Sequence, residues 1–297
     1  MKLAIASAVS AVALAAVAGP ALAKEPSVEI RYAVARVAVV VEDRADVAVE
    51  VEQGSSRLPR VEVTRSGDEI RVNGGLRRGG GLFGGRGTGI NRCETGPDSG
   101  RAGEGAWVEV RDIGRVNLSD APLIVIRTPR DVNVAGSGAI FGSVGRGARS
   151  LELGHGGCGR WDVANVDGAM SLSIGGSGDI RAGTSGSLEV NIGGSGSVTA
   201  GATRNLEVAI GGSGDVNVAR IEGPMSVAIG GSGDVDVRAG TSPDVSISIA
   251  GSGDVNFGGT AGDVDVSIMG GGDVSIARAT GAVSRSVMGG GDIRIGN

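Results

Sequence analysis

The chain has 297 residues, of which 57 are glycine, and aromatic residues make up only 2% of it. Hydrophobic residues still reach 40%, more than a disordered chain contains, and the glycines follow no strict three-residue period, which excludes a collagen-like chain. The formal net charge of −5 argues against nucleic acid as a partner. Many β-branched residues among many glycines favour short strands joined by tight turns.

The N-terminus has the pattern of a secretory signal peptide. Lys2 precedes an apolar stretch, and Ala21-Leu22-Ala23 forms an A-x-A cleavage site. The pattern predicts a signal peptide over residues 1–23 and an exported mature chain, located in the periplasm, at the outer-membrane surface or outside the cell. No later apolar stretch is long enough to span a membrane, so we expect no transmembrane segment in the mature chain.

A β-rich N-terminal region is expected over residues 24–120, because apolar and polar residues alternate in several of its stretches. These strands could be leading coils of the repeat described below or a sheet that covers its first coil. Within the region, a Gly/Arg-rich loop is expected over residues 74–105. The loop has two interpretations: a cationic arm for lipopolysaccharide or anionic glycans, or an insertion without fixed structure.

A repeat dominates residues 121–297. Before each glycine turn, apolar residues alternate with polar or small ones, as in Leu188, Val190 and Ile192, and a shorter alternation such as Val216 and Val218 follows the turn. Period two predicts strands with one buried face. The turns recur about every 19 residues and centre on Ser137, Cys158, Ser177, Ser195, Ser213, Ser232, Ser252, Gly271 and Gly290.

Units of this size favour a stack of coils. Propeller blades need about 40 residues, and no copy has room for a helix. We therefore predict an all-β fold, a right-handed parallel β-helix (β-solenoid) with coils of about 19 residues. In the last coil, Arg285 falls in a column that is apolar elsewhere. We expect it to blunt the C-terminal end of the stack, unless a register shift turns it outward.

The stretch VIRTPRDVNVAGSG (residues 125–138) and the Gly-Ser-Gly-Asp turns that follow it resemble the head GIN domain family, described as auto-transporter adhesin heads. The resemblance covers residues 121–297. It implies a bacterial exported protein with a right-handed parallel β-helix, and it implies little chemistry.

The two cysteines, Cys93 and Cys158, are either a disulfide or two isolated thiols. An oxidising compartment favours the disulfide, which would hold the loop at residues 74–105 against the second coil.

The glycine turns are not expected to bind phosphate, since each leads into a strand rather than a helix. The turns also carry a column of aspartates whose spacing departs from that of the calcium-binding β-roll. Either these carboxylates accept hydrogen bonds from turn N–H groups, or cations lie between them. The aspartates of this column are Asp179, Asp215, Asp234, Asp254, Asp273 and Asp292. We predict that the protein binds no metal and no cofactor.

We also predict no catalytic residue and no enzymatic activity. The single histidine, His155, lies three residues before Cys158, but it falls in the strand column of Ile174 and should point inward, whereas Cys158 lies at a turn. The same coil has Arg160 in place of the column aspartate and Trp161 in place of an aliphatic residue. This irregularity marks where we expect the N-terminal region to dock.

The function favoured by these features is structural or adhesive, at the bacterial cell envelope. One alternative is a periplasmic ligand-binding or sensing module with its ligand in the N-terminal region; a second is a polysaccharide-active β-helix enzyme. The partner is unknown, and envelope polysaccharide or a surface protein would suit a rod that presents repeated polar residues.

Overall fold

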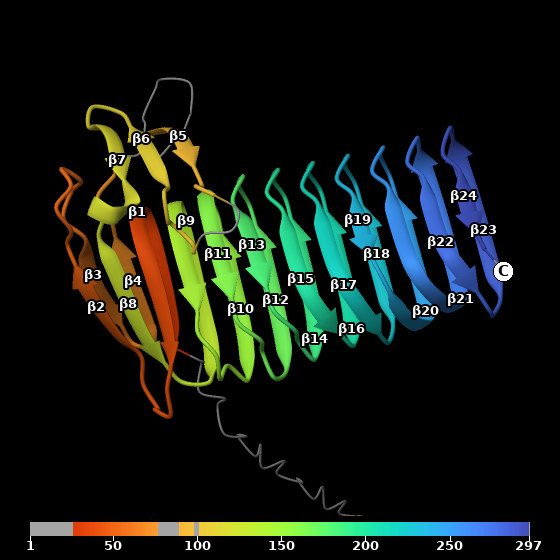
Figure 1. Cartoon of the computed structure of the whole chain (residues 1–297), viewed down its shortest axis with the longest axis horizontal. Helices are drawn as coiled ribbons and strands as arrows, with labels where there is room; N and C mark the ends of the chain where they lie inside the picture. The colour runs from red at the N-terminus through yellow and green to blue at the C-terminus, as the bar shows by residue number, and fades with distance from the viewer. Residues whose placement is uncertain (1–25, 77–88, 98–100, 297) are drawn as a thin grey trace, which may run out of the picture.

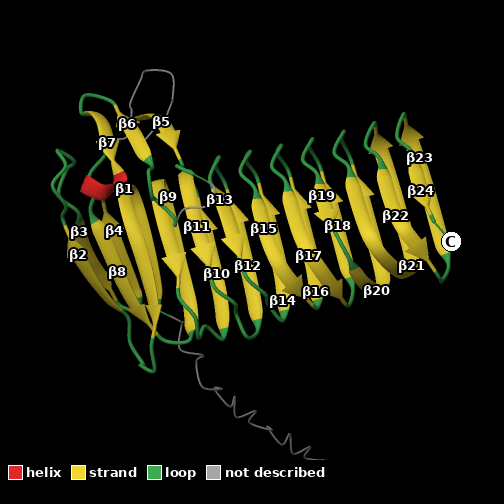
Figure 2. Ribbon diagram, in the orientation of Figure 1, coloured by secondary structure: helices red, strands yellow, loops and turns green. Residues whose placement is uncertain are grey.

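The structure is a computed structural model that describes residues 26–76, 89–97 and 101–296. The predicted signal peptide at residues 1–23 and much of the predicted loop lie outside the described residues. The described chain forms a rod with its N-terminal part at one end and its C-terminus at the other (Figure 1). Apart from one short 3-10 helix, η1 (Leu118–Asp120), its regular elements are strands (Figure 2).

The predicted β-solenoid is confirmed: about nine coils follow one another at a spacing of about 19 residues. Two long sheets run along the rod, and successive coils pair in parallel within each. Sheet I contains β2 (Ala48–Glu52), β8 (Leu123–Thr128), the second halves of β1 (Ser27–Val41) and β9 (Asp131–Val144), β11 (Cys158–Val163), β13 (Asp179–Ala182), β15 (Val198–Thr203), β17 (Val216–Glu222), β19 (Val235–Val237), the start of β21 (Val255–Gly270), β22 (Val274–Ala279) and β24 (Ile293–Ile295).

Sheet II is built from the other strand of each coil. It contains β3 (Glu62–Ser66), β4 (Glu69–Asn73), the first halves of β1 and β9, β10 (Ser150–His155), β12 (Ala169–Ile174), β14 (Ser187–Ile192), β16 (Asn205–Ile210), β18 (Met225–Ile229), β20 (Gly240–Ile249), the end of β21 and β23 (Val283–Gly289).

The core lies between the two sheets and consists of stacked aliphatic side chains. The register keeps equivalent positions aligned, so that Leu188 pairs with Leu206 and Ile192 pairs with Ile210 in the next coil. These four side chains are at most 2% exposed. Burial of one aliphatic face per strand stabilises the stack, and no coil could bury that face alone.

The N-terminal region supplies both leading coils and a cover. β1 lies between β4 and β9 in sheet II and between β8 and β9 in sheet I, so it forms a complete coil without the glycine turn. Its corner is at Tyr32, which has a φ of 51°. At the N-terminal end of the rod, each sheet ends in an antiparallel strand: β2 beside β8 in sheet I and β3 beside β4 in sheet II.

A separate three-stranded sheet contains β5 (Ile90–Glu94), β6 (Trp107–Val110) and β7 (Gly114–Asn117). A second apolar core that includes Val108, Leu118 and Phe141 lies under it. Residues 90–94, expected to be loop, are therefore a strand, because pairing with β6 satisfies their backbone groups. In the described part of the chain, no helix is long and apolar enough to cross a membrane.

Candidate functional site

The most irregular part of the solenoid is the coil formed by β10 and β11. There Trp161 stands in place of an aliphatic residue and Arg160 in place of the column aspartate, and both are buried, with 0% and 1% exposure. Trp161 pairs with Gly142 of the previous coil, and a Cβ atom at Gly142 would lie 2.4 Å from the indole ring. The glycine therefore makes the room that the large ring needs. The irregularity of Trp161 is visible in the sequence, whereas the role of Gly142 appears only in the structure.

His155 ends β10 and lies inside the core, in the column that continues to Ile174. It is 1% exposed, and neither ring nitrogen has a hydrogen-bond partner of normal geometry among the described residues. Burial lowers the pKa of His155 from 6.5 to about 4, because an imidazolium would lose its hydration there; the Asp179 carboxylate and the Gly159 backbone offset part of this effect. The histidine is thus held neutral at physiological pH.

Cys93 and Cys158 are joined by a disulfide with a Cα–Cα distance of 6.4 Å. The bond links β5 to the start of β11 and so ties the three-stranded sheet to the solenoid. Two hydrogen bonds reinforce this docking: Arg160 Nη1 donates to the carbonyl of Pro97 at 3.1 Å, and the N–H of Ala102 donates to Asp162 Oδ2 at 2.8 Å. Because the sulfur of Cys158 is in a disulfide, it is not available as a thiolate nucleophile beside His155.

The aspartate column forms a hydrogen-bonded ladder along one corner of the rod. Asp234 Oδ1 accepts the backbone N–H of Asp254 at 2.8 Å, and Asp254 Oδ1 accepts that of Asp273, also at 2.8 Å. Asp215 and Asp273 bond to the following coil in the same way, and Asp179 bonds to Ser197, which interrupts the column. The described residues contain no group of three or more His, Cys, Asp or Glu side chains that could hold a metal.

Two grooves run along the outer face of sheet II. The larger, of about 870 Å³, is bordered by outward-facing residues from successive coils between residues 169 and 284. The second, of about 700 Å³, lies beside the glycine turns and is bordered by small residues such as Asn191, Ala209 and Ser248. The described lining of the larger groove has no Lys or Arg and has five carboxylates: Glu189, Glu207, Asp244, Asp263 and Asp265. The grooves were not predicted from the sequence, although outward-facing residues of the alternating pattern line them.

Another cavity, of about 520 Å³, lies between the three-stranded sheet and the first coils. Arg36, Arg101, Glu104, Asn117 and Ser119 are among its lining residues. Arg36 Nη2 donates to the carbonyl of Ala121 at 3.2 Å, while its buried Nε has no partner among the described residues. The sequence offered no signal for this cavity, because its walls come from segments far apart in the chain.

The chain is similar to a crystal structure described as "Putative lipid binding protein from Parabacteroides distasonis", with 16% identity, a TM-score of 0.44 and coverage of 92% of this chain and 93% of that chain. No curated protein matches. Residues 200–297 match the family model "Putative auto-transporter adhesin, head GIN domain", a shorter span than the resemblance noted over residues 121–297. The resemblance to the head GIN domain family is therefore confirmed over residues 200–297, the segment with repeated glycine turns and stacked coils.

Proposed function

We propose that this chain is a non-enzymatic, exported β-solenoid with a structural or adhesive role at the bacterial cell envelope. The observation that carries the proposal is the outer face of sheet II, where successive coils present equivalent residues along two continuous grooves. Many weak and equivalent contacts to an extended polymer add up when the partner lies along the rod. The family match over residues 200–297 and the N-terminal signal pattern support export and adhesion.

A binding experiment with matched variants tests this role. Ser246→Arg places a long cationic side chain in the larger groove, whereas Ser275→Arg places the same side chain on the exposed outer face of sheet I. Beads that carry the protein are incubated with purified lipopolysaccharide and with peptidoglycan. We expect Ser246→Arg to change retention by one of these polymers and Ser275→Arg to leave it unchanged. Equal retention of the wild type and both variants would show that the larger groove is not the adhesive surface.

The location of the protein can be tested separately. Protease treatment of intact cells should remove a surface-exposed protein and spare a periplasmic one. Release only after the outer membrane is opened would favour the alternative role of a periplasmic binding or sensing module.

The cavity beside Arg36 favours that alternative over the polysaccharide-active enzyme. It is concave, lies in the N-terminal region and has two guanidinium groups in its lining, which suits an anionic small ligand. Arg36→Gln should weaken binding of such a ligand, and Arg92→Gln, at an exposed position of the three-stranded sheet, is its control. A thermal-shift screen of carboxylate and phosphate compounds in which none stabilises the wild type more than Arg36→Gln would count against this alternative.

A further inference from the structure

The two ends of the rod leave the edges of both sheets open. In the described structure, β2 and β3 have no neighbouring strand on their outer side at the N-terminal end, and β24 and β23 have none at the C-terminal end (Figure 1). Aliphatic side chains are correspondingly exposed at both ends: Val63 of β3 is 42% exposed and Val287 of β23 is 43% exposed. Open edges of this kind are templates for pairing with another chain.

In sheet I, the two open edges match each other. Followed from coil to coil through the strand registers, the column of Ile293 ends at Val51 and that of Ile295 ends at Val49. A second copy that continued the rod would therefore bring β24 beside the β2 strand of that copy, with aliphatic residues adjacent. Because β2 runs antiparallel to β8, the new pair would be antiparallel.

The charges on the outer face of this junction are also complementary. Arg294 lies in the same row as Glu50, and their side chains are 67% and 66% exposed. In the aligned register the guanidinium and the carboxylate would be directly opposite, an arrangement that stabilises antiparallel pairs. A junction of two C-terminal ends lacks this match, because Arg294 of each copy would face the β24 edge of the other copy and not its Glu50.

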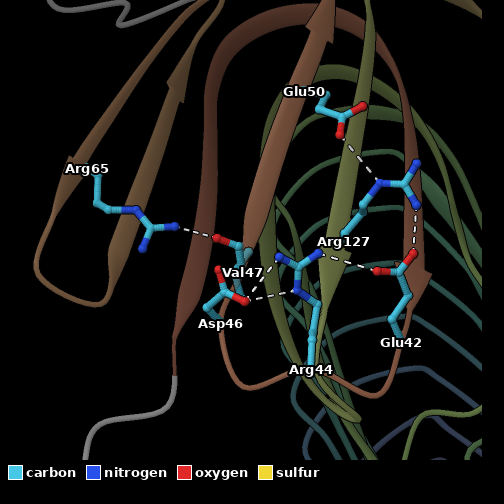
Figure 3. Close-up of polar contacts among 7 residues, drawn as sticks. All are labelled: Glu42, Arg44, Asp46, Val47, Glu50, Arg65 and Arg127. Carbon is cyan, nitrogen blue, oxygen red and sulfur yellow. Dashed lines mark hydrogen bonds and ion pairs between the residues drawn. The ribbon is translucent and has the colours of Figure 1, made fainter.

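In sheet II, one column opposes the junction. Val287 shares its column with Val63, which continues the match, but Arg285 shares its column with Arg65. β23 pairs with β21 without a register shift, so Arg285 occupies the inward column of Val266. At the other end, Arg65 reaches from β3 to the carbonyl of Val47, next to the start of β2 (Figure 3). A junction would place these two cations side by side at an interface from which water is displaced, which is unfavourable.

We propose that the two ends of the rod are complementary surfaces for a head-to-tail contact between copies of this chain, and that repulsion between Arg65 and Arg285 keeps wild-type copies apart. Four inward columns can be followed from one end of the rod to the other. Three of them have an aliphatic residue at each end, and the fourth has Arg285 at one end and Arg65 at the other. Removal of this single like-charge contact should therefore allow association. A head-to-tail contact does not close on itself, so the product should be open chains rather than dimers.

The charge reversal Arg285→Glu tests this proposal. The new carboxylate would oppose Arg65 of the next copy and replace repulsion by attraction, while β23 is exposed along its whole length and should tolerate the change. In sedimentation velocity over a concentration series, we expect the wild type to remain monomeric. Arg285→Glu should form chains that lengthen with concentration, with at least about tenfold tighter association.

Two double variants decide whether the association is head to tail. Arg65→Glu combined with Arg285→Glu restores a like-charge pair and should return the chain to a monomer. In the second double variant, Glu50→Arg is combined with Arg285→Glu. The arginine introduced at position 50 would lie opposite Arg294 of the adjoining copy and should weaken association, although Arg65 is unchanged. A far-UV melt of each variant confirms folding. A monomeric Arg285→Glu protein, double variants that associate as strongly as Arg285→Glu alone, or a wild type that associates equally well would each overturn the proposal.

Discussion

The imidazole of His155 lies so close to Gly178 that a Cβ atom on the glycine would be 1.8 Å from Nε2. One coil further on, the equivalent Gly196 faces Ile174, and a Cβ atom there would be 2.9 Å from Cγ2. The histidine therefore occupies space that the aliphatic residue of the same column leaves free. Its burial in the core depends on the missing side chain of Gly178.

Gly178→Ala is expected to destabilise the protein by about 3 kcal/mol, because the rigid core cannot move the imidazole away without strain. Gly290→Ala is the matched control, since a Cβ atom there meets nothing within 4 Å. Urea unfolding of both variants measures the difference. In the double variant with His155→Ala, the cost of Gly178→Ala should be largely removed, and simple additivity of the two changes would contradict the contact.

The stability of the fold should depend on pH through His155. Because its pKa is lowered from 6.5 to about 4 on folding, the unfolded chain binds more protons between these values. The contribution of the neutral imidazole is therefore complete above pH 6.5, declines as the pH falls and is lost below about pH 4. Between pH 7.5 and 4.5 the free energy of unfolding should drop by roughly 2–3 kcal/mol from this group.

Urea unfolding of the wild type and of His155→Ile at the two pH values isolates this contribution. Isoleucine is the residue at the same position in coils such as that of Ile174, so the variant should fold. Carboxylates titrate in both proteins, and the difference between the two curves belongs to the histidine. Parallel pH dependence in the two proteins would mean that His155 is not held neutral by burial.

Removal of the disulfide is expected to free the three-stranded sheet from the solenoid. Cys93 and Cys158 are 65 residues apart, and the loop-closure entropy of such a link corresponds to about 4 kcal/mol at most. In the Cys93→Ser/Cys158→Ser variant, amide exchange in β5 to β7 should become faster while that of β14 to β20 stays unchanged. Uniform acceleration along the whole rod would show that the disulfide supports the solenoid itself.

The aspartate ladder should contribute through its acceptor oxygens rather than through its charge. Asp254→Ala leaves the N–H of Asp273 without its acceptor and should cost about 1 kcal/mol. Asp254→Asn keeps an Oδ1 acceptor and should cost less. Thermal melts compare both variants with Asp265→Ala, a change at an exposed position of the same solenoid. A larger loss for asparagine than for alanine, or stabilisation by added calcium that Asp254→Asn abolishes, would point to cations in the column.

Much of the solenoid can be predicted from the sequence, because its stabilising contacts are local copies of one another. The period of about 19 residues and the alternation around residues such as Leu188 and Ile192 specify two strands, a turn and a buried face. Once the coils stack in register, residues at equivalent positions of successive coils form continuous columns. The repeat pattern does not predict the coil formed by β1, because this strand turns its corner at Tyr32 without a glycine turn. Only its pairing with β9 identifies it as a coil.

The candidate surfaces were harder to predict. The groove on sheet II depends on how side chains of successive coils line up, and the cavity beside Arg36 depends on the docking of β5 to β7. The position of Arg285 in an inward column could be read from the repeat. Its relation to Arg65 could not, because Arg65 belongs to an antiparallel hairpin outside the periodic segment.

The sequence by itself therefore determined the coil: its length, its glycine corner, its inward aliphatic residues and its row of aspartates. A short-range pattern is sufficient for these, since each is specified by neighbours within one repeat. The tertiary structure alone decided how the rod begins and ends and which residues lie at its two edges. Arg65 and Arg285 are 220 positions apart and lie at opposite ends of the rod, and only the stacked register shows that they share one column.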